Sequence, residues 1–184
     1  MLRIVGGHLA LDLANTATAD QEFLPGLPAV LAWAQRVEVL TEAEAEQVER
    51  SPGDTFAEVL RLRALVGETL AGRRLDTLTA RWAEAIGRSE LRPADPGATL
   101  VVGRDPETML GDRLTVALVD LLQHADLAKL RTCPPEEGGC GFLFLDRSRN
   151  RSRRWCSMDD CGTNVKVKRL TERRRSAAES RKRR

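Results

Sequence analysis

The stretch that decides the fold is residues 131–169, RTCPPEEGGCGFLFLDRSRNRSRRWCSMDDCGTNVKVKR. It contains all four cysteines of the chain: Cys133, Cys140, Cys156 and Cys161. Their spacing is C-x6-C, then fifteen residues, then C-x4-C, and an apolar, strand-like segment at residues 142–145 separates the two pairs. Four thiolates fill the coordination sphere of a structural Zn²⁺ and leave no open position. The pattern therefore favours a structural zinc site.

Disulfide bonds, an iron–sulfur cluster and inert core cysteines compete with zinc as explanations of this cluster. Disulfides persist in oxidising compartments. The opening MLRIVGGHLALDLANTATAD does not read as an export signal, since no charged leader precedes a clean apolar core and Asp12 interrupts the run. Inert core cysteines explain less well why all four lie within 29 residues. An iron–sulfur cluster stays open, because iron also accepts four sulfur ligands.

A longer pattern around the second cysteine pair carries a resemblance to a known family. Its positions are occupied by Phe144, Asp146, Ser148, Asn150, Arg153, Arg154, Trp155, Cys156, Ser157 and Met158. In the order F-x-D-x-S-x-N-x-x-R-R-W-C-S-M they resemble the signature of the bacterial CGNR zinc-finger family. The resemblance implies one structural Zn²⁺ held by the four cysteines. It also implies a stress-linked transcription regulator that binds DNA in the cytoplasm, at the nucleoid.

The sequence departs from this family pattern in two places. The first cysteine pair is separated by residues 134–139, a longer knuckle than the usual spacing of about four residues. The name-giving Cys-Gly-Asn-Arg motif reads Cys161-Gly162-Thr163-Asn164 in this chain, so the arginine of the motif is missing. A phosphate contact, or a hydrogen bond beside the metal, is expected to be lost with that arginine. Upstream, LALDLANT at residues 9–16 resembles the opening of ABATE, the sensor-like domain that accompanies this finger.

Charge is strongly segregated along the 184 residues. Residues 131–184 contain 16 Lys/Arg and 7 Asp/Glu, a net charge of +9, whereas residues 1–130 contain 13 and 20, a net charge of −7. An acidic body with a basic end predicts a polyanionic partner for the basic end alone. No apolar run approaches the length that spans a bilayer, so no membrane association is expected.

The basic residues that we predict to contact nucleic acid lie in the loop before Cys156 and on the helix after it. They are Arg147, Arg149, Arg151, Arg153, Arg154, Lys166, Lys168, Arg169 and Arg173. Only four of the 29 basic residues are lysine, and the guanidinium fork suits bidentate contacts to phosphate or guanine. Trp155 could stack on a base, but its position beside Cys156 favours packing over the zinc hairpin.

The body, residues 1–127, reads as a series of helices. Thr41 and Glu44 form a capping-box pattern that begins one of them, and Asp76 or Thr77 is expected to cap a later one. Residues 99–102 are the one convincing strand of the body. Trp33 and Trp82 recur at helical spacing with leucine and alanine, so both are expected in the core.

Other polar residues of the body have mainly structural interpretations. Asn15 or Thr16 is expected to end the first element by bonding to its own backbone, and His124 to interact with a helix end. Arg61 and Arg63 are expected on a solvated face. His8 and Asp12 could form an acid–base pair, but no nucleophile or metal ligand accompanies them. The sequence contains no phosphate-binding glycine loop, nucleophile elbow or HExxH, so we expect no enzyme and no catalytic residues.

The predicted fold is mainly α. A helical, sensor-like domain at residues 1–127 precedes a small treble-clef-like finger, a β-hairpin plus helix with a Zn(Cys)4 site, at 128–172. A basic, disordered tail is expected at 173–184. Few apolar side chains lie beyond residue 130, so metal binding must supply stability to the finger, about 10 kcal/mol by analogy with isolated fingers.

The predicted function is zinc-dependent DNA binding in transcription regulation. The helical body would sense a small-molecule ligand or mediate homodimerisation. An RNA- or ribosome-associated factor with the same basic finger is the alternative, because phosphate contacts alone do not specify a sequence or a type of nucleic acid. An enzyme that uses the finger as a structural staple is the third hypothesis.

Overall fold

The structure of the chain is a computed structural model that describes residues 2–168 and 170–171. Arg169 and Arg173, predicted to contact nucleic acid, and the tail predicted at 173–184 lie outside the described residues. None of the helices in the described part combines the length and hydropathy that crossing a membrane requires.

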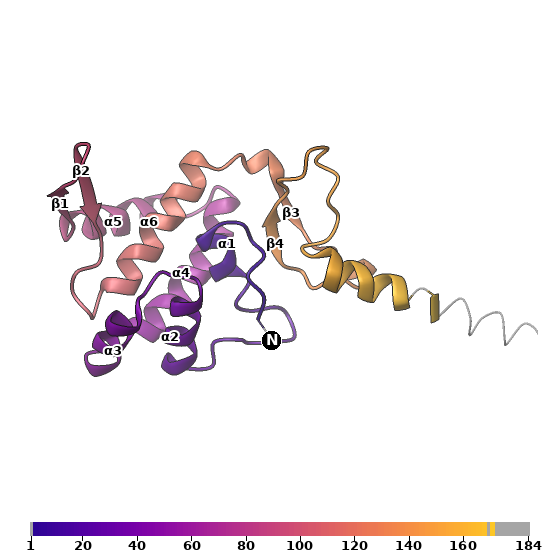
Figure 1. Cartoon of the computed structure of the whole chain (residues 1–184), viewed down its shortest axis with the longest axis horizontal. Helices are drawn as coiled ribbons and strands as arrows, with labels where there is room; N and C mark the ends of the chain where they lie inside the picture. The colour runs from indigo at the N-terminus through magenta and orange to yellow at the C-terminus, as the bar shows by residue number, and fades with distance from the viewer. Residues whose placement is uncertain (1, 169, 172–184) are drawn as a thin grey trace, which may run out of the picture.

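The fold is mainly helical, as predicted, and its two parts lie end to end (Figure 1). The body contains α1 (Leu9–Ala14), α2 (Leu27–Arg36), α3 (Glu42–Arg50), α4 (Thr55–Leu70), α5 (Leu75–Gly87), a hairpin of β1 (Glu90–Pro93) and β2 (Ala98–Val101), and α6 (Met109–His124). The finger contains the 3-10 turn η1 (Leu127–Lys129), β3 (Leu130–Thr132), the 3-10 turn η2 (Pro135–Glu137), β4 (Leu143–Leu145) and the π-helical turn η3 (Met158–Gly162). Residues 163–168 continue the last turn as an α-helix.

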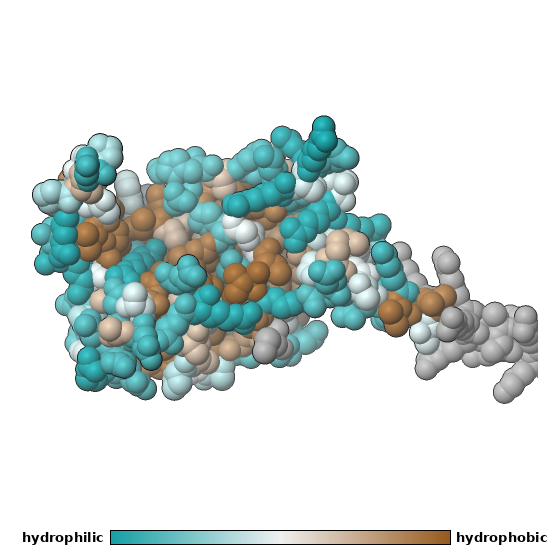
Figure 2. All heavy atoms as spheres, in the orientation of Figure 1, coloured by the Kyte–Doolittle hydropathy of each residue, from teal (hydrophilic) through white to brown (hydrophobic). Residues whose placement is uncertain are grey.

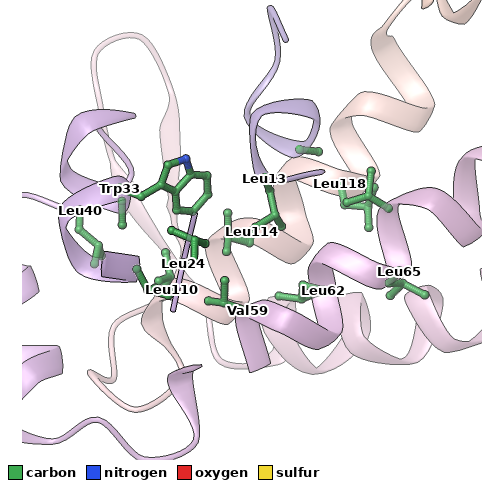
Figure 3. Packing of buried hydrophobic residues seen from close by; sticks show 14 of the residues in the cluster. Leu13, Leu24, Trp33, Leu40, Val59, Leu62, Leu65, Leu110, Leu114 and Leu118 are labelled. Carbon is green, nitrogen blue, oxygen red and sulfur yellow. The ribbon is translucent and has the colours of Figure 1, made fainter. Parts of the chain in front are cut away.

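The core of the body lies between α1, α4 and α6. Leu13 of α1, Leu62 of α4 and Leu114 and Leu118 of α6 are at most 1% exposed and point toward one another (Figure 3). Each such side chain contributes about 1.5–3 kcal/mol when its burial is complete. In the orientation of Figure 1, hydrophilic side chains cover much of the visible face of the body, with hydrophobic areas between them (Figure 2). The helical periodicity of the sequence therefore corresponds to buried stripes on these helices.

The capping box predicted at Thr41 is confirmed. The Thr41 Oγ1 accepts from the Glu44 amide at 3.3 Å, and the Glu44 carboxylate accepts from the Thr41 amide at 2.9 Å. Arg113 of α6 donates to the same carboxylate at 2.6 Å and lowers the pKa of Glu44 to about 2. One glutamate thus begins α3 and fastens it to α6.

Several local predictions for the body are wrong. Trp33 is buried at 3% exposure, but Trp82 is 36% exposed because it lies on the outer side of α5. The α5 helix begins after Arg74, which adopts a left-handed φ of 53°, without a side-chain cap from Asp76 or Thr77. Arg63 is not solvated: its guanidinium bonds to Glu22 at 2.7 Å and is 17% exposed. Side-chain type alone did not show which helix face meets a neighbour.

The strand predicted at residues 99–102 has a partner that the sequence did not reveal. Antiparallel β1 and β2 pair Leu91 with Leu100, and both side chains are exposed. The segment Glu90–Pro93 is charged and ends in proline, so it lacks the apolar alternation by which a strand is recognised. This hairpin lies at the end of the molecule opposite the finger (Figure 1).

Polar residues of the opening segment hold it in place by hydrogen bonds. Asp12 accepts from the Val5 and Gly6 amides at 3.0 and 2.8 Å, which folds the chain start back over α1. His8 does not pair with Asp12; it caps α1 through the Ala10 amide, and its Nε2 lies 3.0 Å from Asp120 of α6. The acid–base pair considered from the sequence is therefore not formed.

Asn15 joins the body to the finger. Its amide nitrogen donates to the Leu143 carbonyl at 2.8 Å, and its oxygen accepts from the Leu143 amide at 2.7 Å. The prediction that Asn15 or Thr16 bonds to the backbone of its own segment is confirmed by Thr16, whose hydroxyl donates to the Leu13 carbonyl at 2.7 Å. The side-chain amide of Asn15 thus bonds to both backbone polar groups of Leu143, as a residue of an adjacent β-strand would.

Two further bonds extend this junction along β4. The Leu145 amide donates to the Gly6 carbonyl at 3.0 Å, and Arg147 donates to the Gly7 carbonyl at 2.7 Å. The Leu145 side chain, 7% exposed, belongs to the core of the body. Strand β4 is therefore held on one edge by β3 and on the other by the chain start.

Replacing Asn15 by alanine should destabilise the folded chain by about 2–3 kcal/mol, because it leaves both polar groups of Leu143 without their partner. Urea denaturation at a fixed free zinc concentration measures this change. Asn164→Ala, at an exposed position of the finger helix, serves as the matched control and should shift stability by less than about 0.5 kcal/mol. Equal stability of the two variants would contradict a structural role for Asn15.

Candidate metal centre

The first cysteine pair is brought together by a glycine-rich knuckle after β3. Cys133 and Gly141 close it by backbone bonds: the Cys133 amide donates to the Phe142 carbonyl at 2.9 Å, and the Gly141 amide donates to the Cys133 carbonyl at 3.0 Å. Gly141 has a φ of +79°, which L side chains rarely adopt. A Cβ at Gly139 would lie 2.8 Å from the Cys133 sulfur. The six-residue spacing is therefore accommodated by glycines that let the chain double back.

The second cysteine pair is brought together by the turn η3. The Ser157 hydroxyl accepts from the Asp160 amide at 3.2 Å and caps this turn, and the chain then turns so that Cys161 faces Cys156. A Cβ at Gly162 would come within 3.2–3.3 Å of Met158 and Trp155, so this glycine lets the turn close against them.

The four sulfur atoms form a single cluster. All lie within 4.8 Å of one another, with Cys140 and Cys156 at 3.4 Å and Cys156 and Cys161 at 3.7 Å. Sulfur atoms about 2.3 Å from a tetrahedral Zn²⁺ are separated by about 3.8 Å, so the cluster fits this ion. Bound zinc would act as a structural cross-link, because the four thiolates leave no position for substrate or water.

The pKa values of the cysteine thiols show that the four groups do not ionise independently. The hydrogen bond with Cys140, together with burial, raises the pKa of Cys156 well above its ordinary value. The same bond lowers the pKa of Cys140 to about 5, and burial raises the pKa of Cys133. Neighbouring thiolates oppose one another's ionisation, whereas a divalent cation favours the ionised form of all four.

Arg3 of the body contacts the metal centre, although the sequence analysis did not single it out. One guanidinium nitrogen lies 3.3 Å from the Cys161 sulfur, and another lies 3.3 Å from the Asp160 carboxylate. The guanidinium carbon also lies 5.5 Å from the centre of the Phe142 ring. The body thus donates a hydrogen bond and a positive charge to a metal ligand, which offsets part of the negative charge of a Zn(Cys)4 group.

An apolar cluster supports the metal centre from inside the finger. It includes Phe142, Phe144, Trp155 and Val165, each at most 8% exposed. Trp155 packs in this cluster, as predicted. Leu2, Val5 and Phe23 of the body pack against it, and Phe23 meets Phe142 edge to face, with ring centres 6.1 Å apart. The finger therefore completes its small core with side chains from the chain start.

The arginines of the loop before Cys156 divide into two groups, of which the first is bonded within the finger. Arg153 donates to the Trp155 and Cys156 carbonyls, and its guanidinium lies over the Phe144 ring at 4.9 Å. Arg154 pairs with Glu137 and lies 5.7 Å from the Trp155 ring. If Arg153 and Arg154 contact nucleic acid as predicted, their guanidinium groups must either keep these internal bonds while also binding phosphate or exchange them for bonds to phosphate.

The second group is exposed, as Arg154 is too, and Arg147 of this group donates to the Gly7 carbonyl of the body. Arg147, Arg149 and Arg151 lie on the loop that follows β4, and Lys166 and Lys168 lie on the helical residues 163–168. Arg151 makes a long ion pair of 3.8 Å with Asp126. Asp146, fully buried, fixes the start and end of this loop by accepting from the Ser148 and Arg153 amides at 2.9 and 3.0 Å. The signature residues Asp146, Ser148 and Arg153 therefore shape the loop.

Residues 129–174 match the family model of the CGNR zinc finger. Comparison of the whole chain with curated proteins finds no match. The family match covers all four cysteines and confirms the resemblance deduced for this part of the chain. With the geometry of the sulfur cluster, it identifies one structural zinc site and resolves the choice between zinc and an iron–sulfur cluster. The resemblance of residues 9–16 to ABATE stays a prediction.

Replacing Cys156 by serine should remove zinc from the purified protein, because one of the four ligands is lost. Metal analysis should give about one zinc per chain for the unchanged protein and a small fraction of that for the variant. The matched control is Ser152→Ala, an exposed position in the same loop, which should keep its zinc. Full zinc content in Cys156→Ser would contradict the assignment.

Replacing Arg3 by methionine should weaken zinc binding about 10-fold, because the ligand Cys161 loses its hydrogen bond and its compensating charge. Competition with a chelator of known affinity measures the change. Arg3→Lys should recover part of the affinity by restoring the charge, and Arg50→Met on α3, 68% exposed, should have no effect. Equal zinc affinities of the Arg3→Met and Arg50→Met variants would show that Arg3 only packs against the finger.

Proposed function

We propose that the chain is a zinc-dependent DNA-binding protein that regulates transcription. The observation that carries this proposal is the exposed basic surface on the finger, which we define as Arg147, Arg149, Arg151, Lys166 and Lys168. These residues are held by an element whose shape depends on zinc. The net charge of +9 beyond residue 130, against −7 in the rest of the chain, supports a polyanion as the partner.

The loop is suited to phosphate because its backbone is fixed while its side chains are exposed. Asp146 and the Ser148 hydroxyl hold the turn at residues 148–152, so arginines 149 and 151 extend from an ordered base. Less conformational entropy is lost when an ordered loop binds than when a flexible one does. Guanidinium groups presented in this way can make bidentate bonds to phosphate oxygens.

The body would add regulation to this contact. Its helical core packs against the finger through Asn15, Gly6 and Arg3, so a ligand or a second copy that acts on the body could alter the finger. Sensing of a small molecule and homodimerisation are both proposed for this part. The stress-linked role and the location at the bacterial nucleoid rest on the family resemblance.

An RNA- or ribosome-associated factor is the second candidate. The same basic surface would engage A-form RNA through its phosphates, and no base-specific contact distinguishes the two polymers. An enzyme with a structural zinc is the third hypothesis; the acid–base pair considered from the sequence, His8 with Asp12, is not formed, and His8 lies 3.0 Å from Asp120 instead.

The zinc-loaded protein should bind duplex DNA with an affinity that falls steeply with salt. If about six phosphates are engaged, the slope of log affinity against log salt is about −5, and the Arg149→Gln/Arg151→Gln double variant should reduce its magnitude by about 2. Fluorescence anisotropy at several salt concentrations measures both slopes. Structured RNA of equal length, titrated in parallel, should bind more weakly.

The matched control is Arg50→Gln/Arg73→Gln, which removes two exposed arginines from the body and should leave the slope unchanged. A slope near zero for the unchanged protein would contradict the proposal. Tighter binding to RNA than to DNA would favour the second candidate.

A further inference from the structure

A cavity of about 680 Å³ opens beside the metal centre. Ala19, Gln21 and Phe23 of the body line one side of it, and Gly139, Cys140 and Gly141 of the first zinc knuckle line the other. A space of this size is within the range of small-molecule sites and far exceeds what a peroxide molecule needs. It gives solvent and small solutes a path to the cysteine cluster.

Cys140 is the ligand that lines this cavity. It is partly exposed, whereas Cys133, Cys156 and Cys161 are 0%, 0% and 5% exposed. Both neighbours of Cys140 in the chain are glycines, which the knuckle requires for its backbone geometry and for room beside Cys133. Because glycine has no side chain, neither residue covers the Cys140 sulfur. The fold of the knuckle thus leaves one ligand open to attack.

The sulfur atom beside Cys140 is that of Cys156, at 3.4 Å. A sulfur oxidised at Cys140 would therefore have a second thiolate within reach from inside the finger. An accessible thiolate with a resolving cysteine next to it is the arrangement that favours reversible oxidation to a disulfide. Arg3 also lines the cavity and lies 3.3 Å from the Cys161 sulfur, so it places a positive charge beside the cluster.

We propose that Cys140 is an oxidation site at which hydrogen peroxide opens the zinc centre. The Cys140 thiolate attacks one peroxide oxygen, the O–O bond breaks, and the departing hydroxide takes up a proton to become water. The Cys156 thiolate attacks the sulfur of the resulting sulfenic acid, the S–S bond forms as the S–O bond breaks, and the departing hydroxide takes up a proton from solvent to become a second water. Two sulfur atoms lose two electrons in total, and one peroxide is reduced to two waters.

Disulfide formation removes two of the four ligands, so the zinc ion is released. The finger then loses its cross-link, and residues 147–168 lose the element that orders them. This inference depends on the zinc site and not on the proposed binding of nucleic acid. If both hold, oxidation weakens DNA binding; if only the first holds, zinc release still follows peroxide.

The test uses the full-length, zinc-loaded chain and hydrogen peroxide. Zinc release is followed with a chromogenic chelator, and samples taken during the reaction are alkylated, digested and analysed by mass spectrometry. We expect one zinc per chain to be released as a Cys140–Cys156 disulfide forms. Limited alkylation of the unoxidised protein should modify Cys140 before the three other cysteines. First reaction at any other cysteine would overturn the proposal.

A second measurement tests the path to the sulfur. Ala19→Trp should fill part of the cavity and slow zinc release by peroxide on the order of fivefold, since rates of thiolate oxidation depend on access. Ala83→Trp, at an exposed position of α5, is the matched control and should release zinc at the original rate. Equal rates in the two variants would overturn the role of the cavity. If Ala19→Trp fails to retain zinc, the order of alkylation in the unchanged chain still decides the proposal.

Discussion

The confinement of four cysteine sulfur atoms within 4.8 Å of one another is the constraint on which the carboxyl-terminal part of the structure depends. Ionised thiols repel one another in a site that is largely buried, and a divalent cation removes this repulsion. The glycine-rich knuckle, the capped turn at Ser157 and the cluster around Trp155 are all arranged to bring the sulfurs together. Zinc binding would therefore contribute directly to the stability of this segment.

The finger is nevertheless not independent of the helices that precede it. Its strand β4 takes hydrogen bonds from Asn15 and Gly6, its apolar cluster is completed by Leu2, Val5 and Phe23, and its ligand Cys161 is bonded by Arg3. The chain start thus serves both parts, since the same short segment continues into the buried helix α1. Any regulation of the finger by the body has this segment as its shortest route.

Arginines of the loop before Cys156 have different environments in the folded chain. Arg153 and Arg154 are bonded to carbonyls and to Glu137 beside aromatic rings, whereas Arg149 and Arg151 extend from a turn fixed by Asp146. The family signature specifies Arg153 and Arg154, whereas Arg149 and Arg151 stand at positions that it leaves open. The proposed contact with a polyanion is better assigned to Arg149 and Arg151 than to Arg153, because Arg153 would have to give up its bonds to two backbone carbonyls.

The sequence by itself determined the zinc ligands, the finger family, the mainly helical class and the capping box at Thr41, because each depends on residues close together along the chain. It did not reveal that β1 pairs with β2, that Trp82 faces outward, or that His8 bonds to Asp120 and not to Asp12. The bonds of Arg3 to Cys161 and of Asn15 to Leu143 join positions 158 and 128 residues apart. Only the tertiary structure decided these contacts, because local spacing sets which face of an element is apolar but not which distant element covers it.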